Sequence, residues 1–310
     1  MENLFILPLA LVVDLAFGEY PHKLHPVEWM GQVISWQLKL VPGNSDKSRF
    51  VYGMFIMLLT VALFAVPVYF ILLYIRGVSI IAYLLVAAVL LKSTFSLRGL
   101  YQAIKKVKRL LDAGEIREAR KEMDYLVSRD TRRLDKEHVI SAVVEMAAES
   151  VTDSMVAPLF YWLILGVPGA VAYRVVNTFD SRIGYRGQCE YLGKCAARLD
   201  DVLNYIPARL SGLLLVISAY IGRTNGGSAW RLMQRDHTRT ESPNAGWTMS
   251  AVAGALWVQL EKPGCYRLGN ADKPLALSSI ATGLRLVVLT SILWFGICVG
   301  ITGVRYALAA

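Results

Sequence analysis

Three carboxylates at four-residue spacing are the residues whose pattern points most directly to chemistry. Glu145, Glu149 and Asp153 lie in residues 136–154, which contain neither Gly nor Pro, and Asp135 can cap a helix that starts there. At about 100° per residue the three acids turn through only about 80°, so they share one stripe of the helix. Mg²⁺ prefers oxygen ligands and commonly bridges to nucleotide phosphates. The spacing therefore predicts a metal site formed by these acids, and the alternative is a solvated acidic face.

The surroundings of this stripe favour a site. No Lys or Arg follows an acid of the stripe at the third or fourth position, and the segment leads into the apolar residues 155–160. Charged side chains beside apolar runs cost several kcal/mol unless they are paired, hydrated or bound to a ligand. Residues 174–209 and 223–250 concentrate such side chains, although each cluster alone fits a turn or a cap. We therefore expect one membrane-embedded polar site, with contributions from Asn177, Asp180, Arg198, Asp200, Asp201, Asn204 and Arg209.

The composition indicates helices that cross a membrane. The chain has 310 residues, of which 55% are hydrophobic and 18% charged, a mixture typical of membrane spans joined by aqueous loops. Segments in which apolar and polar residues alternate, as they do in a half-buried strand, are scarce. We therefore predict an all-α polytopic membrane protein with about five to eight membrane-associated helices. The clearest spans are residues 51–75, 78–91 and 286–304, and the helices expected to be short, re-entrant or broken are residues 4–17, 155–176 and 210–221.

The distribution of basic residues predicts the orientation. Residues 92–153 contain 13 Lys and Arg, whereas the tight connection at Arg76-Gly77 contains one, so the large loop should be cytoplasmic. We expect a single integral membrane domain over residues 1–310, with a helical cytoplasmic region at residues 92–154. Its expected location is the cell (inner or plasma) membrane, as a multi-pass protein with its site facing the cytoplasm. This loop bias and attraction to anionic lipid headgroups together explain the net charge of +9, and no nucleic-acid-binding motif is present.

Several other chemistries find no support in the sequence. The four cysteines, Cys189 among them, form no C-x-x-C pair, which argues against a zinc site and a disulfide framework. Neither a Walker motif nor a G-x-G-x-x-G motif occurs, so no nucleotide motif is visible. The four histidines lie in no recognisable nucleophile context.

The polar clusters, in their order along the chain, resemble those of the adenosylcobinamide-phosphate synthases, the CobD/CbiB family of membrane proteins. The resemblance extends over nearly the whole chain, and the ordered combination is specific to that family. The matching clusters are Asp14 to Gly18, His25-Pro26-Val27 with Gly31, Ser128 to Thr131, the acidic helix, Pro158 to Phe160, Gly166 to Ala170, Asn177-Thr178 with Asp180, Gly184-Tyr185, Ala197 to Asp201, Pro207 to Leu210 and Ser242 to Gly246.

The resemblance implies an ATP-dependent amide ligase that uses ATP and Mg²⁺. Such an enzyme joins adenosylcobyric acid, a corrinoid, to (R)-1-amino-2-propanol O-2-phosphate or a related amino-alcohol phosphate through an acyl phosphate. Its implied partners are these two substrates and the lipid bilayer, with a homo-oligomer or association with other cobalamin-assembly enzymes left open. The alternative is a non-catalytic regulatory or transport protein of the same architecture.

The same resemblance implies roles for individual residues. The acids Glu145, Glu149 and Asp153 would hold Mg²⁺ against ATP, and Asp180, Asp200 and Asp201 would add ligands or a base. Three departures from the family pattern, Met146, Ser150 and Arg182, lie near this centre. Arginines would neutralise phosphate groups, and other polar side chains would contact substrate. The expected substrate-binding residues are His25, Arg129, Asp130, Asn177, Arg198, Asn204, Arg209, Ser242 and Asn244.

Overall fold

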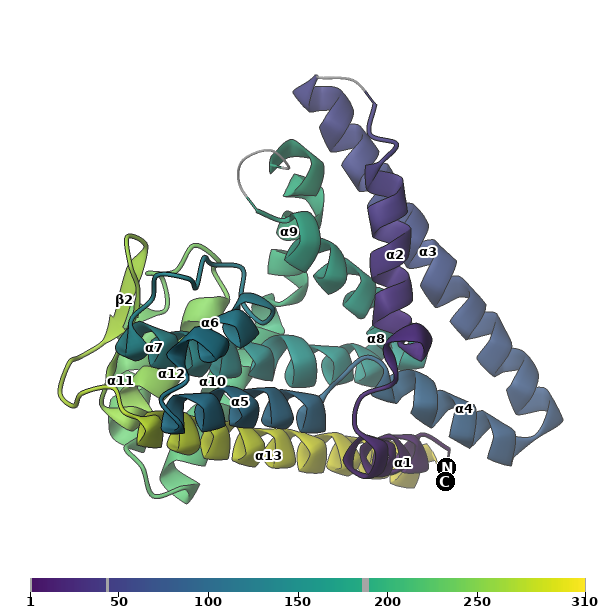
Figure 1. The fold of residues 1–310 in the computed structure, drawn as a ribbon. Coiled ribbons are helices and arrows are strands. Elements are labelled where there is room, and N and C mark those ends of the chain that lie inside the picture. Colours follow the sequence, from purple (N-terminus) through teal and green to yellow (C-terminus); the bar gives the residue numbers. More distant parts are fainter. Residues whose placement is uncertain (1, 43–44, 186–189, 310) are drawn as a thin grey trace. The chain divides into compact units, whose positions relative to one another are not determined.

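The computed structural model describes residues 2–42, 45–185 and 190–309 (Figure 1). Cys189, and with it residues 186–189 of the predicted polar segment 174–209, lies outside the described residues. The chain forms two compact units, and each is described by itself. Unit 1 comprises Met1–Ser96, Ala157–Leu203 and Phe295–Ala310, and unit 2 comprises Leu97–Val156 and Asn204–Trp294.

Unit 1 is built around one long helix, α3, which packs against α4, α8 and α9, while α1 packs against α4 (Figure 1). The bounds are α1 Glu2–Phe17, a 3₁₀ turn at His22–Leu24, α2 Pro26–Leu38, α3 Asp46–Val78, α4 Ile80–Lys92, α8 Ala157–Ile183, α9 Glu190–Leu203 and the last part of α13. Helix α4 begins because the Ser79 hydroxyl accepts a hydrogen bond from the backbone of Ala82, so the predicted hairpin bends at Ser79, two residues after Gly77.

Helix α8 is interrupted, as its Pro and Gly content predicts. Gly166 adopts φ of 71° and ψ of −167°, which are not helical angles, and Pro168 follows two residues later. A residue with a Cβ atom would be strained at this φ, whereas glycine adopts it readily. The apolar stretch 155–176 is therefore a broken helix.

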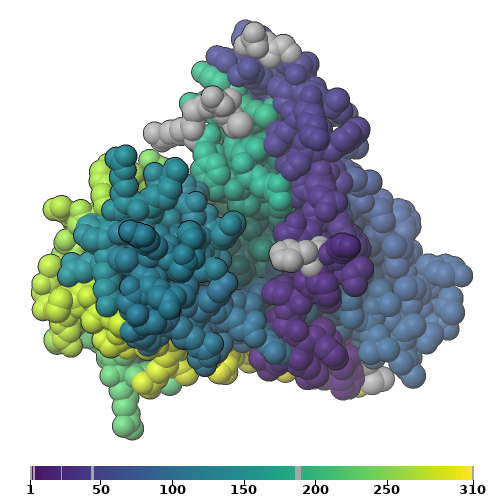
Figure 2. All heavy atoms as spheres, viewed as in Figure 1, coloured from purple at the N-terminus to yellow at the C-terminus, as the bar shows by residue number. Residues whose placement is uncertain are grey.

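Unit 2 contains most of the predicted cytoplasmic region 92–154. It also contains residues 204–209 of the first predicted polar segment and all of the second, residues 223–250. Residues 97–124, coloured dark teal, lie at the front of this unit in Figure 2. The bounds are α5 Leu97–Asp112, α6 Ile116–Asp124, α7 Lys136–Val151, a π-helical turn at Thr152–Val156, α10 Tyr205–Ile221, α11 Gly226–Asp236, α12 Ala245–Leu256, β1 Gln259–Lys262, β2 Tyr266–Gly269 and the first part of α13, Leu277–Ala309.

Helix α7 starts where the sequence predicts. The Asp135 carboxylate accepts a hydrogen bond of 2.9 Å from the backbone nitrogen of His138, as an N-cap residue does. Its apolar side is buried throughout, including Ile140 and Val151. The regular α-helix ends at Val151, and the next five residues, Thr152–Val156, form a π-helical turn. Such turns occur frequently at functional sites, and this one contains Asp153.

A small antiparallel hairpin is the one departure from helical structure in the described chain. Strand β1 pairs with β2 so that Leu260 lies opposite Leu268, and both side chains are fully buried. Its four-residue strands are too short to give a clear alternation of apolar and polar residues, so the sequence does not predict the hairpin. The fold class remains all-α, with this hairpin added to unit 2.

Several helices are long and apolar enough to cross a membrane. By length and composition there are four in the described chain, or five if α9 and α10 together form one span. Many apolar side chains of α3, such as Phe55 and Leu58, are exposed and available to lipid. The protein is therefore a multi-pass membrane protein. The predicted spans 51–75 and 286–304 lie within the candidates Asp46–Val78 and Leu277–Leu308, the predicted span 78–91 overlaps the candidate Ile80–Asp112, and the fourth candidate is Lys136–Ile183.

Candidate functional site

Glu145 is the centre of a buried hydrogen-bonding network in unit 2. Its side chain is almost completely buried. One carboxylate oxygen, Oε2, accepts hydrogen bonds from the Arg129 guanidinium and, at 2.7 Å, from the Tyr266 hydroxyl. The other oxygen, Oε1, accepts from the Ser141 hydroxyl at 2.5 Å. The carboxylate is thereby paired with a cation and bonded by two neutral donors, which offsets the cost of burying its charge.

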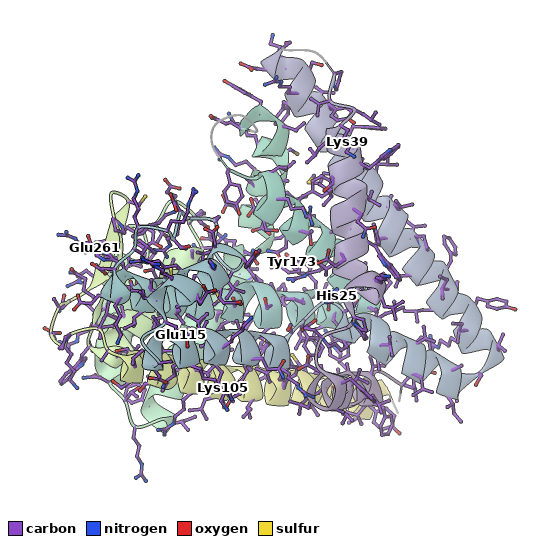
Figure 3. The ribbon with its side chains drawn as sticks, viewed as in Figure 1. His25, Lys39, Lys105, Glu115, Tyr173 and Glu261 are labelled. Carbon is purple, nitrogen blue, oxygen red and sulfur yellow. The ribbon has the colours of Figure 1, made fainter. Side chains whose placement is uncertain are left out.

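The same network fastens the hairpin to α7. The backbone nitrogen of Glu261 on β1 donates a 2.8 Å hydrogen bond to the Ser141 hydroxyl, while Tyr266 extends from β2 to Glu145. Glu261 is labelled on the hairpin in Figure 3. Burial and the neighbouring Glu145 charge raise the pKa of Tyr266, so its hydroxyl remains a hydrogen-bond donor at neutral pH.

The three acids of the stripe have different surroundings. Glu145 is buried, Glu149 is exposed and Asp153 is partly buried. Because three donors engage Glu145, we assign it to holding Arg129, whereas Glu149 and Asp153 remain candidates for Mg²⁺. Among the described residues, no three His, Cys, Asp or Glu side chains are grouped to hold a metal. One or two carboxylates with substrate phosphates suffice for Mg²⁺, so the donors fit a metal that arrives with a nucleotide.

Arg209 forms the second cluster of unit 2. Its guanidinium carbon lies 3.4 Å from the ring centroid of Tyr205 and 4.8 Å from that of Trp247. One guanidinium nitrogen donates to the Tyr205 carbonyl at 2.6 Å and to the Asn244 side chain at 3.4 Å. Two aromatic rings thus hold a cation at the start of α10, an arrangement suited to binding a phosphate or carboxylate group.

Asn204 connects this cluster to the acidic helix. Its side-chain amide is buried and donates a 3.2 Å hydrogen bond to Asp153, so the start of α10 is tied to the π-helical turn. The Ser242 hydroxyl accepts from the backbone of Asn244 at 3.2 Å and shapes the turn before α12. The predicted residues Asp153, Asn204, Arg209, Ser242 and Asn244 are therefore brought together by α10, α12 and the π-helical turn.

Gly246 allows this approach of α12. A Cβ atom at Gly246 would lie 2.1 Å from the carbonyl oxygen of His237, far inside contact distance. The ring of His237 in turn packs at 4.1 Å from that of Trp247. Glycine at this position therefore lets the Arg209 cluster form against the end of α11.

Each of the two clusters contains a buried donor that has no acceptor among the residues that the structure describes. These donors are Nη1 of Arg129 in the first cluster and Nε1 of Trp247 in the second. A buried donor that lacks an acceptor costs roughly 1–3 kcal/mol, and a bound anion is one way to satisfy it. The donor set therefore fits ligands that carry phosphate or carboxylate oxygens.

The remaining predicted residues belong to unit 1. Asn177 and Asp200 are both buried, and the amide of Asn177 donates to Asp200 at 3.3 Å. The Arg174 guanidinium donates to the Asn177 carbonyl oxygen at 3.1 Å. Asp180 lies in the last turn of α8, and its backbone carbonyl accepts a hydrogen bond from Gly184, just after the helix. On α9, Arg198 is exposed and Asp201 is partly buried. The structure thus places Asn177 and Asp200 together.

His25 lies at the start of α2 (Figure 3). One ring nitrogen accepts a hydrogen bond from the backbone of Val27, and the other lies 2.8 Å from the Glu19 carboxylate. Glu19 also pairs with Lys92, which is fully buried and lies 3.1 Å from Asp14. His25 therefore belongs to a network of alternating charges that joins α1, α2 and α4.

Comparison with known proteins identifies the family to which the chain belongs. The family model described as CobD/Cbib protein matches residues 7–287. A Dehalococcoides mccartyi protein named "Cobalamin biosynthesis protein CobD" is 50% identical over 97% of this chain and 98% of its own. The chain belongs to the CobD/CbiB family. A Methanothermobacter thermautotrophicus protein named "Probable cobalamin biosynthesis protein CobD" is 41% identical over 95% of this chain and 96% of its own. No solved structure matches the chain.

As a CobD/CbiB member, the chain acts in cobalamin biosynthesis, and its Ser128–Thr131 motif forms an ordered loop. Asp130 is exposed, and the backbone nitrogen and guanidinium of Arg132 hold the pKa of its carboxyl below the usual value. Thr131 is buried and donates a 2.7 Å hydrogen bond to the carbonyl of Arg120 on α6. We therefore interpret Asp130 and Thr131 as residues that shape the loop carrying Arg129.

The three departures from the CobD/CbiB pattern have structural partners. Met146 and Ser150 contact each other on α7, with the Ser150 hydroxyl 3.7 Å from the Met146 sulfur. Arg182 donates a 3.0 Å hydrogen bond to Ser35 on α2 and lies over Gly31, where a Cβ atom would meet its guanidinium at 2.2 Å. Met146 and Ser150 are thus neighbours in contact, and Arg182 fills the space above Gly31.

Sequence reasoning missed several residues of the two candidate clusters. Ser141 and Tyr266 bind Glu145, while Tyr205 and Trp247 enclose Arg209. Tyr205 and Trp247 adjoin segments that the resemblance had identified. The Pro263-Gly264 dipeptide next to Tyr266 is a turn signal that could have suggested a hairpin.

Proposed function

We propose that this protein is an ATP-dependent amide ligase that joins adenosylcobyric acid to an amino-alcohol phosphate, giving adenosylcobinamide phosphate. In the proposed reaction a carboxylate oxygen of the corrinoid attacks the terminal phosphorus of ATP, and ADP leaves. The amine then attacks the carbonyl carbon of the acyl phosphate, so that an amide forms and phosphate and one proton are released. Family membership supports a step in cobalamin biosynthesis.

The observation that carries the proposal is the enclosure of Arg209 by Tyr205 and Trp247. A guanidinium held between two rings keeps a fixed plane, and it can donate two parallel hydrogen bonds to a phosphate. We assign Arg209, with Asn244 beside it, to the phosphate of the amino alcohol. Asn204 orients Asp153 toward the same cluster through the 3.2 Å hydrogen bond.

The Glu145 network supports a second role for unit 2. Glu145 orients Arg129, whose Nη1 atom is buried and has no acceptor among the described residues. We assign Arg129 to an anionic group of ATP or of the corrinoid carboxylate. Mg²⁺ held by Glu149 and Asp153 would neutralise phosphate charge. To the unit 1 residues we assign the roles that the resemblance to the family implies; these residues are His25, Asn177, Asp180, Arg198, Asp200 and Asp201.

The proposed location is the cell membrane, with the site on the cytoplasmic side. The 13 basic residues between positions 92 and 153 support this orientation. ATP is a cytoplasmic substrate, which agrees with it.

The decisive experiment supplies detergent-solubilised protein with ATP, Mg²⁺, adenosylcobyric acid and (R)-1-amino-2-propanol O-2-phosphate. The proposal predicts a corrinoid product with the mass of the amide, formed together with stoichiometric ADP and phosphate. Reactions lacking ATP or the amine serve as controls. Corrinoid uptake into sealed vesicles with no amide formed would instead identify a transporter.

A further inference from the structure

Two neighbouring cavities in unit 2 lie outside both clusters described above. The first has a volume of about 610 Å³ and is lined by α11 and by the segment after β2. The second, of about 460 Å³, lies among the end of α10, the end of α12 and the start of α13. Trp257 and Lys273 line both cavities, so the two spaces adjoin.

The cavities carry an excess of positive charge. Arg231 lines the first cavity, Arg223 lines the second and Lys273 lines both. None of the three forms an ion pair with a described residue. The Lys273 ammonium lies 4.9 Å from the ring centroid of Trp257. Arg235 also lines the first cavity, but it forms an ion pair with the fully buried Asp236. The two cavities together are therefore lined by these three cations and by a single carboxylate, Asp272, and this excess of positive charge favours an anionic ligand.

The backbone of the second cavity is unusual. Arg223 has a φ of 54° and Trp257 a φ of 59°, and within the described residues they are the only non-glycine residues with positive φ. Each follows the end of a helix, a place where glycine normally adopts this conformation. Strained residues of this kind cluster at ligand sites. Here the conformation places an arginine and a tryptophan on the wall of one cavity.

The cavities also lie at the ends of apolar helices. The first turns of α13, a candidate membrane span, contribute Ser279 and Thr282 to the second cavity. Arg285 of α13 donates a 2.9 Å hydrogen bond to the carbonyl of Gly222, which joins this end of α13 to the end of α10. Trp, Lys and Arg are enriched where spans meet the headgroup region of a bilayer.

Helix α10 exposes an apolar stripe that runs toward the second cavity. Leu213, Ile217 and Tyr220 follow one another at helical spacing and are all exposed, and α10 ends directly after them. Such a stripe is suited to acyl chains, with headgroups beyond its end. A soluble phosphate compound has no acyl chain that could pack against this apolar surface.

We propose that the two cavities bind the phosphate-bearing headgroup of an anionic phospholipid, whose acyl chains lie along the α10 stripe. Arg223, Arg231 and Lys273 bind the phosphate, and the Trp257 indole lies at the level of the headgroup. This site is separate from the residues assigned to the ligase and does not depend on that assignment. It gives the protein a preference for membranes that contain acidic lipid.

The test uses the full-length protein in lipid nanodiscs that contain phosphatidylglycerol or only phosphatidylcholine. Bound lipid is measured by mass spectrometry after detergent extraction, together with the unfolding temperature. Wild type should retain phosphatidylglycerol in preference to phosphatidylcholine and unfold at a higher temperature in its presence. Lys273→Gln and Arg231→Gln, made separately because each side chain is exposed, should each weaken this retention about fivefold. The matched control is Arg117→Gln, which removes an exposed cation from α6 and should change nothing.

Two results would overturn the proposal. One is equal retention of phosphatidylglycerol by wild type and both variants, while their unfolding temperatures in phosphatidylcholine match. The other is full stabilisation of the lipid-free protein by inorganic phosphate or ATP alone, with no further gain from phosphatidylglycerol. That second result would identify a site for a soluble phosphate compound.

Discussion

The Tyr266 hydroxyl donates a 2.7 Å hydrogen bond to the Glu145 carboxylate, although 121 positions separate the two residues. Glu145 also binds Arg129, so the hairpin and the loop before α7 meet at one buried carboxylate. A hairpin near the end of the chain thereby fixes an arginine proposed to bind an anion.

Replacing Tyr266 with Phe should destabilise the protein by about 2 kcal/mol, because a hydrogen bond to a buried charged group is lost. The measurement is thermal unfolding of the purified protein in detergent. Tyr125→Phe is the matched control, since the Tyr125 side chain is 88% exposed. Equal stability of Tyr266→Phe and wild type would mean that this bond does not hold the hairpin on α7.

The two glutamates of the stripe should respond differently to replacement by Gln. Glu145→Gln should destabilise the fold by about 3 kcal/mol, because it leaves the partly buried Arg129 without a counter-charge. Glu149→Gln should leave stability nearly unchanged, since Glu149 is exposed, but lower kcat about 100-fold if it holds Mg²⁺. Unfolding and turnover are measured together, with exposed Glu137→Gln on the same helix as control. The same loss of stability in both variants would contradict the separation of roles.

Acid should weaken the network around Glu19, which lies in the loop between α1 and α2. Burial alone would raise the pKa of Glu19, but hydrogen bonds from His25 and Ser96 and the charge of Lys92 lower it to about 2 from 4.5. A lowered pKa contributes stability above pH 4.5, and this contribution is lost as the pH falls toward 2.

The expected size of this contribution is about 2 kcal/mol, reduced by solvent because Glu19 is partly exposed. Glu19→Gln should remove this part of the acid dependence, as measured by unfolding between pH 5 and pH 2.5. The control is Glu241→Gln, at an exposed position in unit 2. Identical acid profiles for Glu19→Gln and wild type would exclude Glu19 as the source.

The predicted orientation can be tested by labelling single cysteines in oriented vesicles, after the four native cysteines have been replaced. Ser128→Cys and Ser181→Cys, both at exposed positions, should react with an impermeant reagent from the cytoplasmic side. Gly77→Cys should react from the opposite side, and a Cβ atom there meets no atom within 4 Å. Labelling of Ser128→Cys and Ser181→Cys from opposite sides would refute the predicted topology.

Local signals explain what the sequence could predict. The Asp135 cap, the start of α7 and the apolar runs of α3 and α13 depend on residues adjacent in the chain, and the structure contains each of them. The break in α8 also follows from its own residues, Gly166 and Pro168. The family could be identified because its motifs are short and ordered.

Contacts between distant segments explain what the sequence could not predict. The four-residue spacing does not distinguish the three acids, but in the structure Tyr266 and Arg129 both bind Glu145, which is buried, whereas Glu149 is exposed. The stacking on Arg209 requires α10 and α12 to pack together. The π-helical turn at Thr152–Val156 carries no Gly or Pro that would mark it.

The most direct test of the proposed site compares two amines as substrates for wild type and Arg209→Ala. The amines are 1-amino-2-propanol phosphate and the same amino alcohol without phosphate, and Arg117→Ala is the control. Loss of a charge-assisted contact should lower kcat/KM for the phosphorylated amine about 100-fold and leave the unphosphorylated amine within about twofold. An equal loss for both amines, or no loss for either, would contradict the assignment of Arg209 to the phosphate.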